Sequence, residues 1–330
     1  MTVEGNEGSG FGVQVKKQAQ TTARRALGII LSAFVLAACA VLPRGEWPPE
    51  TDGVPPRSEI VSVPFFPQDD YQCGPAALAM ALGWSGLDVQ PSDLTEKVYT
   101  ASLRGSLQPA MIAGARRSGR MAYVIYGTDA LIHEVAAGHP VVVLQNLGLS
   151  WAPRWHYAVA IGYDLPADAI VLHTGLRARE RTAMGVFQNT WARAGNWGLL
   201  VLPPGRLPAT AREAETVEAA LGLEKARQPA AAAEAYRAAL ARWPQNLPAM
   251  MGLGNSHYAL GDLGNSELAF RRAAQTHPEN GAAFNNLAHV LRALGRREEA
   301  LSAAQRAVAL GGPQSDVFKK TLEEIQASAP

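Results

Sequence analysis

Cysteine and charge of either sign are both scarce in this chain of 330 residues. Only two cysteines occur, which excludes a fold held together by a framework of disulfides. Lys and Arg number 30 against 29 Asp and Glu, and a formal net charge of +1 gives no sign of a nucleic-acid partner. The one apolar segment able to meet a membrane is Ala26 to Ala38, which is shorter than the roughly 20 residues of a spanning helix. A hydrophobic content of 48% nevertheless predicts a folded protein, long enough for two domains.

The N-terminal region has the pattern of an export signal. Arg24-Arg25 precede the apolar segment, and small residues follow it. The end of this region, Leu36-Ala37-Ala38-Cys39, resembles the lipobox of bacterial lipoproteins, in which cleavage leaves a lipidated cysteine as the new N-terminus. The resemblance implies a signal peptide over 1–38 and lipidation at Cys39. Because Ala40 follows instead of Asp, it also implies an outer-membrane anchor facing the periplasm. A plain secretory signal with a chance cysteine is the alternative.

A proline-rich segment follows the export signal. Residues 39–59 contain Pro48-Pro49 and Pro55-Pro56 and show no periodicity, so they are expected to form a stiff, extended spacer. Ile60 to Phe66 is then predicted to be a short strand that leads to Gln68.

Cys73 stands where a polar turn meets an Ala-rich helix. Pro75 is tolerated in a first helical turn, and the helix is expected to stop at Gly83 to Gly86. Its buried stripe is predicted to contain Ala77, Leu78, Ala81 and Leu82. A thiol at a helix N-terminus feels the positive end of the dipole, so its pKa is expected to fall from about 8.5 towards roughly 3.5–7.5. A nucleophile is predicted on this basis, with an inert structural cysteine as the alternative.

His156 begins a second informative segment. With a period of two, His156 shares a strand face with the small residues Ala158, Ala160 and Gly162. The helix that begins at Cys73 is expected to pack against this cleared face. A histidine in that position can accept the thiol proton and return it to a leaving amine.

These blocks, in this order, resemble the papain-like cysteine peptidases that process bacteriocin leaders after a double glycine, and in particular their stand-alone bacterial relatives. The resemblance covers roughly Ile60 to Pro204. It implies an α+β fold in which a helix-borne cysteine faces a mostly antiparallel sheet. It also implies that Gln68 forms the oxyanion hole, Cys73 is the nucleophile and His156 is the general base and acid.

One position departs from the pattern of that family. The third catalytic member is usually an Asp at the end of the strand after the histidine strand, and Thr174 stands there, preceded by His173. A Thr hydroxyl or a backbone carbonyl can orient the imidazole, but neither stabilises imidazolium as a carboxylate does. Asp164 and Asp168 are the candidate substitutes, although both are expected in an exposed turn.

The C-terminal third of the chain repeats at a spacing of 34 residues. Five columns match, and they include Tyr236 with Phe270 and Ala304, and Gly261 with Gly295. This period resembles that of tetratricopeptide repeats. An all-α solenoid of about three repeats with a capping helix at Ser315 to Ala327 is therefore expected over 211–327. Its groove is expected to bind a protein partner.

The sequence therefore predicts a membrane-anchored cysteine peptidase with its catalytic domain at 60–204, joined by a separable linker at Pro203-Pro204-Gly205 to the repeats. A peptide or protein is the expected substrate, cleaved through a thioester acyl-enzyme. No metal-ligand spacing and no phosphate-binding loop are present, so neither metal nor cofactor is expected. The alternatives are a peptidase-fold scaffold that only binds peptides, and an acyl or amide transferase that uses the same Cys-His pair.

Overall fold

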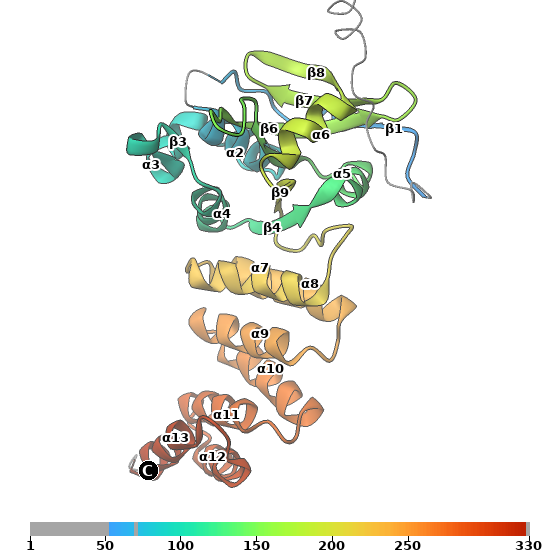
Figure 1. Ribbon diagram of the computed structural model, residues 1–330. Coiled ribbons are helices and arrows are strands. Elements are labelled where there is room, and N and C mark those ends of the chain that lie inside the picture. The colour runs from blue at the N-terminus through green and yellow to red at the C-terminus, as the bar shows by residue number, and fades with distance from the viewer. Residues whose placement is uncertain (1–52, 69–71, 328–330) are drawn as a thin grey trace, which may run out of the picture. The chain divides into compact units, whose positions relative to one another are not determined.

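A computed structural model describes residues 53–68 and 72–327 of the chain. The predicted signal peptide, the lipidation site Cys39 and most of the proline-rich spacer lie outside these residues. The described residues form a region of strands and helices followed by a run of helices (Figure 1). Within them, no helix combines the length and the apolar character that crossing a membrane requires.

One antiparallel sheet forms the centre of the first region. Its strand order is β4-β9-β5-β6-β7-β8, and β1 pairs with β6 beside this path. A separate pair, β2 and β3, lies outside it. The strands are β1 (Arg57–Glu59), β2 (Tyr99–Thr100), β3 (Gly105–Ser106), β4 (Met121–Tyr126), β5 (Val141–Asn146), β6 (Trp155–Asp164), β7 (Ala169–Thr174), β8 (Arg177–Ala183) and β9 (Trp197–Leu202).

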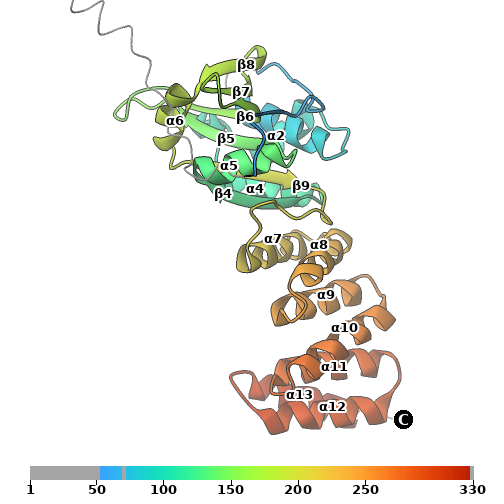
Figure 2. The same cartoon turned by 90° about the vertical axis from the view of Figure 1, so that its right-hand side faces the viewer.

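Helices cover both faces of this sheet (Figures 1 and 2). One face carries α2 (Cys73–Trp84), α3 (Pro91–Val98) and α4 (Gln108–Arg117), and the other carries α5 (Gly127–Ala136) and α6 (Met184–Ala192). A hydrogen bond from Gln188 to Thr128 joins α6 to α5. At the start of α3, the Gln90 N–H donates a hydrogen bond to the Asp93 carboxylate at 3.0 Å.

The helix α2 differs from the predicted amphipathic one. Every residue from Gly74 to Leu82 is buried, so the helix has no solvent face. An apolar stripe cannot be recognised in such a helix, because neighbouring elements surround it on all sides. It ends at Trp84, and Gly86 takes a left-handed φ of 93° in the following turn.

The predicted strand at Ile60 to Phe66 is wrong, because β1 precedes it. Arg57–Glu59 pairs with β6, so the spacer also ends earlier than predicted. Ile60 continues the pairing with one bond to the Ile161 carbonyl, and Pro64 and Pro67 then lack the donors that a ladder needs. Instead, the ring of His173 holds the segment through the Val63 carbonyl at 3.2 Å.

The C-terminal region consists of helical hairpins. The helices are α7 (Glu213–Lys225), α8 (Pro229–Arg242), α9 (Leu247–Ala259), α10 (Leu263–Thr276), α11 (Gly281–Ala293), α12 (Arg297–Leu310) and α13 (Ser315–Ala327). Gly261 and Gly295 have left-handed φ values of 74° and 75° in the turns inside two hairpins. Arg227 holds the same repeat position in the first hairpin, with φ 58°, so the turn conformation persists there without glycine.

Repeated aromatic residues pack against glycines of an adjacent helix. Tyr236 and Phe270 are buried, and a Cβ at Gly252 or Gly254 would lie 2.2 Å and 2.6 Å from their respective rings. Only glycine therefore allows these helices to approach each other. Gly252 and Gly254 both belong to α9, so the two aromatic residues of one 34-residue column pack on this helix from α8 and from α10.

The segment between the two regions is held by the first region. Glu134 is fully buried and accepts hydrogen bonds from the backbone N–H groups of Ala209 and Thr210, the Thr210 hydroxyl and the His139 ring. The first helix of the repeats, α7, packs against the edge strand β4. The predicted separable linker is therefore a pinned connection in this structure.

Candidate active site

Cys73 is the first residue of α2 and is partly buried. The next residue, Gly74, packs so closely on Ser106 that a Cβ there would come within 2.2 Å of its hydroxyl oxygen. The hairpin formed by β2 and β3 therefore fixes the beginning of α2 and with it the thiol. Backbone N–H groups of Tyr157, Gly74 and Cys73 itself surround the sulfur.

Gln68 is buried and bridges two strands at this point. Its side-chain Nε2 donates to the Tyr157 carbonyl at 3.1 Å, and its Oε1 accepts from the Gly175 N–H at 2.8 Å. A donor on one side and an acceptor on the other fix the orientation of the amide. One Nε2 hydrogen remains for a ligand. The structure thus brings Gln68 and Cys73 together at the backbone of Tyr157.

His156 precedes Tyr157 in β6 and bonds to Thr174. The distance from Nε2 to the Thr174 Oγ1 is 2.7 Å, and Thr174 ends β7. When Nε2–H donates to this oxygen, the ring is held with its Nδ1 lone pair free. The hydrogen bond to Thr174 therefore holds the ring of His156 at the end of β7. No hydrogen bond between His156 and Cys73 occurs in the described ranges.

The predicted packing of α2 on the His156 face is wrong. Gln145 lies directly opposite His156 across β5 and β6, and its side chain bonds to Thr190 of α6 at 2.7 Å. That face is therefore turned towards α5 and α6. The helix α2 packs against β6 from the other side of the sheet (Figure 2). Burial and then the nearby charge of Cys73 raise the pKa of the Tyr157 hydroxyl, which indicates that Tyr157 faces this helix. Cys73 therefore lies at the backbone N–H of Tyr157, one residue along the chain from His156.

The predicted lowering of the Cys73 pKa is also contradicted. Burial raises the pKa of the thiol above its ordinary 9.0, although the N–H groups of Tyr157, Gly74 and Cys73 act in the other direction. Desolvation of the thiolate outweighs these dipoles because the helix that carries the thiol is enclosed on all sides. Cys73 therefore rests as a neutral thiol at neutral pH.

His156 is likewise neutral. Burial, helped by the nearby Arg154 guanidinium, lowers the pKa of its ring from 6.5 to about 4. The difference between the raised pKa of the thiol and the lowered pKa of the imidazole makes transfer of the proton from Cys73 to His156 unfavourable in the resting protein. Thr174 supplies no charge to reduce this difference.

Asp164 and Asp168, the candidate substitutes for the missing carboxylate, do not lie beside His156. Asp164 lies at the far end of β6, eight residues from His156, roughly 26 Å away at about 3.3 Å per residue. It is buried, against the prediction, and binds Arg57 at 3.0 Å and Arg181 at 2.7 Å. Asp168 lies beyond it, in the turn before β7. Neither residue orients His156.

Sequence reasoning missed the residues that support the site. Tyr157 contributes through its backbone, which no residue-type pattern reveals. Asn146 is buried, and its Oδ1 accepts from the N–H groups of Gly148 and Arg154, which fixes the loop that leads to His156. An Asn at the end of an apolar strand is the only signal for this role. In the described parts of the chain, no group of three or more His, Cys, Asp and Glu side chains is arranged to hold a metal ion.

The first region is an antiparallel sheet with a cysteine at the start of its packed helix, and comparisons with known families identify this region and the repeats. The peptidase C39-like family matches residues 60–198, and the tetratricopeptide repeat family matches residues 217–281 and 266–315. The chain therefore carries a peptidase C39-like domain followed by C-terminal tetratricopeptide repeats. The fold class and the two kinds of domain expected from the sequence are confirmed.

Solved structures show limited likeness to parts of the chain. A putative C39-like peptidase from Bacillus anthracis is 19% identical with a TM-score of 0.38, over 44% of this chain and 97% of that one. The first tetratricopeptide repeat domain of Spaghetti (RPAP3), bound to an HSP90 peptide, is 18% identical with a TM-score of 0.33, over 34% and 90%. The Yersinia enterocolitica secretion chaperone SycD, in complex with a YopD peptide, is 18% identical with a TM-score of 0.33, over 34% and 91%. No curated protein matches.

Proposed function

We propose that the first domain is a cysteine peptidase in which Cys73 is the nucleophile and His156 the general base and acid. The observation that carries this proposal is the convergence on Tyr157. Its backbone meets the Cys73 thiol and the Gln68 amide, and the preceding residue of β6 is a histidine held by Thr174. Nucleophile, base and orienting group are the parts that acyl transfer through an enzyme thiol needs.

The neutral resting pair determines how the reaction begins. The Cys73 sulfur attacks the peptide carbonyl carbon while its proton passes to Nδ1 of His156, so no free thiolate accumulates. The resulting oxyanion is stabilised by the free Nε2 hydrogen of Gln68 and the N–H of Cys73. His156 then gives its proton to the leaving amine as the C–N bond breaks, and a thioester remains. Water, deprotonated by His156, hydrolyses the thioester.

Hydrolysis of fluorogenic peptide pools tests this function. In a Cys39→Ser background Cys73 is the only thiol, so Cys73→Ala should abolish both turnover and labelling by an electrophilic peptide probe. Product analysis in the presence of an added amine distinguishes hydrolysis from transfer. Turnover that survives Cys73→Ala would contradict the assignment.

A binding scaffold without turnover is the second candidate. It is favoured by the neutral Cys73 and His156 and by a threonine where a carboxylate is usual. For this function, labelled peptides should bind wild type and Cys73→Ala equally, with no product formed over long incubation. Product formation by wild type would exclude it.

We also propose that the repeats recruit a protein partner and that a lipid on Cys39 anchors the chain in the outer membrane, facing the periplasm. The 34-residue repeat supports the first part, and the motif Leu36-Ala37-Ala38-Cys39 supports the second. Each buried CH₂ of an acyl chain contributes about 0.8 kcal/mol to membrane binding, so several chains anchor a protein stably where a single chain does not. Cys39→Ser should release the protein from the membrane fraction, and retention at the wild-type level would contradict the anchor.

A further inference from the structure

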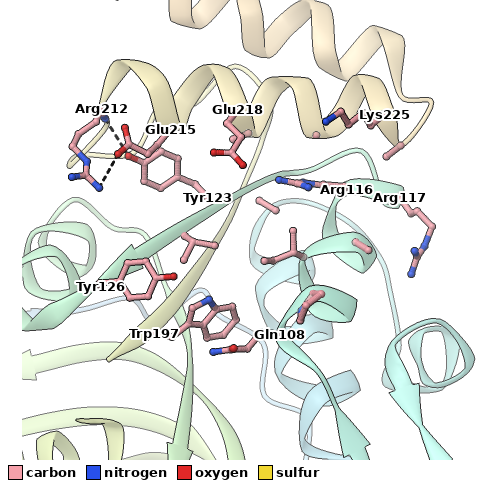
Figure 3. Close-up of a pocket in the computed structure, with 18 of the residues that line it drawn as sticks. Gln108, Arg116, Arg117, Tyr123, Tyr126, Trp197, Arg212, Glu215, Glu218 and Lys225 are labelled. Carbon is pink, nitrogen blue, oxygen red and sulfur yellow. Dashed lines mark hydrogen bonds and ion pairs between the residues drawn. The ribbon is translucent and has the colours of Figure 1, made fainter. Parts of the chain in front are cut away.

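A trough of about 980 Å³ lies beside the first helix of the repeats (Figure 3). One wall is α4, another is α7, and the strand β4 with Trp197 forms the floor. It is distinct from the site around Cys73, which is built from α2, β6 and β7. Both domains contribute to it, so its shape depends on the pinned connection at Glu134.

One end of the trough is apolar and aromatic. Val124 and Tyr126 project from the same face of β4, and Trp197 lies opposite Tyr126 on β9. Tyr126 is 63% exposed, which is unusual for a ring on a sheet face. Ile112 of α4 extends this surface towards the centre.

The other end carries excess positive charge. Two carboxylates, Glu215 and Glu218, line the trough with five cationic side chains, Arg116, Arg117, Arg212, Lys225 and Arg227. Arg212 pairs with Glu215 at 2.9 Å, and Glu218 attracts Arg116. The excess of three positive charges is therefore concentrated at the end formed by Arg117, Lys225 and Arg227.

Arg116 connects the two ends. Its guanidinium lies against Gly222 of α7 so closely that a Cβ there would come within 2.3 Å of Cζ and Nε. The Nε is buried and has no hydrogen-bond partner in the described structure. A buried donor without an acceptor is unfavourable, so the site is incomplete as it stands.

We propose that this trough binds an acidic peptide segment of a protein partner, with carboxylates at Arg116, Lys225 and Arg227 and an apolar side chain against Tyr126. Charge complementarity supports an anionic occupant, and the Arg116 Nε supplies a donor for one of its oxygens. A small inorganic anion would fill neither the volume nor the aromatic end. The position next to α7 lets the same partner continue along the repeats.

Binding to the full chain tests this inference by fluorescence anisotropy. The probe is a labelled peptide with one tryptophan followed by four glutamates, and its partners replace the glutamates with glutamines or the tryptophan with glycine. The test variant is Lys225→Glu with Arg227→Glu, because both side chains are exposed and their loss leaves the core intact. The matched control is Lys319→Glu with Lys320→Glu on α13, which changes the net charge equally.

The acidic peptide should bind wild type and the α13 control alike and should lose about tenfold or more in affinity for the α7 variant, since like charges then face each other. Its glutamine form should bind at least tenfold more weakly to wild type, and added salt should weaken the acidic form. Tyr126→Ala should reduce affinity only for peptides that contain tryptophan.

Equal losses in the α7 variant and the α13 control would overturn the proposal, because net charge alone would then explain binding. Equal binding of the glutamate and glutamine forms would overturn it too. A change in oligomeric state confined to the α7 variant would instead identify the trough as an interface between copies of the chain. None of these readouts depends on peptidase turnover, so they test the trough separately from the active site.

Discussion

The peptidase-like domain and the repeats differ in how far along the chain their contacts reach. Gln68 bonds to Gly175 across 107 residues and to Tyr157 across 89, and both contacts build the active site. In the repeats, Tyr236 bonds to Glu224 and Ser266 to the Gly254 carbonyl, each across 12 residues. The free energy of unfolding of the repeats is therefore a sum of contributions from neighbouring helices, whereas the geometry around Gln68 depends on the complete sheet.

This difference predicts that single changes act locally in the repeats and globally in the first domain. Charged side chains are also placed differently in the two regions. The first domain buries Glu134, His139, Asp164 and His173 with specific partners, while the ion pairs of the repeats, such as Arg292 with Glu324, lie at the surface. Surface pairs contribute little, and buried ones fix geometry.

The largest effect is expected at His156, the proposed catalytic base. His156→Ala should reduce peptide turnover by about 10²–10⁴, the usual contribution of a positioned acid–base group. Because His156 is already neutral, the alkylation profile of Cys73 should keep its inflection above 9 in both proteins. An inflection below 7 in wild type, lost in His156→Ala, would show a preformed thiolate–imidazolium pair and contradict the neutral resting state.

The connection between the domains gives the next largest effect. Glu134→Gln should lower the free energy of unfolding by about 3 kcal/mol, because an amide nitrogen would face donors from His139, Ala209 and Thr210. These bonds also lower the pKa of Glu134, although burial opposes them. This stability is therefore present at neutral pH and is lost as pH falls through the depressed pKa, below 4.5.

Chemical denaturation at pH 7 and pH 4 measures this contribution, and Glu323→Gln on the exposed face of α13 is the control. A chain cut after Pro204 should show the same loss, because Glu134 would keep only His139 and the edge of β4 would be uncovered. Wild-type stability in both altered proteins would show that the two domains are independent.

A change inside the repeats should remain local. Gly252→Ala places a methyl group on the ring of Tyr236, and overpacking of this kind costs about 1–3 kcal/mol. Gly264→Ala is the matched control, because open space surrounds that position on the next helix. Hydrogen exchange should increase around α8 and α9, with peptide turnover unchanged. Loss of turnover at temperatures where the repeats remain folded would indicate coupling beyond neighbouring hairpins.

Much of this fold could be predicted because the determinants are local. The 34-residue columns record contacts between adjacent helices, and Val141 to Asn146 and Trp155 to Asp164 are strands whose apolar character is evident. Cys73 and His156 were found by residue type and position. The face of β6 that meets α2 could not be found in this way. A period of two assigns side chains to the two faces of a strand, but it does not show which helix covers each face.

The electrostatics of the site could not be predicted for the same reason. A helix N-terminus favours a thiolate, but the sequence around Cys73 does not show that α2 is buried on every side. Desolvation depends on the surrounding elements, and here it reverses the direction of the Cys73 shift. The effect of Arg154 on the pKa of His156 was equally hidden, because a cation two residues before His156 in the sequence has no defined distance from the ring.

The smallest expected effect is that of Arg154 on the pKa of His156. His156 must be neutral to act as a base, so turnover should fall only as pH drops through about 4. Arg154→Ala removes the second cause of that low value and should move the acid inflection upward, by roughly one pKa unit or less because burial remains the larger cause. Thr174→Asp should move it further in the same direction, since a carboxylate favours imidazolium. Arg237→Ala, an exposed cation of α8, should leave the inflection unchanged. An inflection near 6.5 in wild type, unaffected by Arg154→Ala, would mean that His156 is solvated in the working enzyme and that the neutral pair does not set the chemistry.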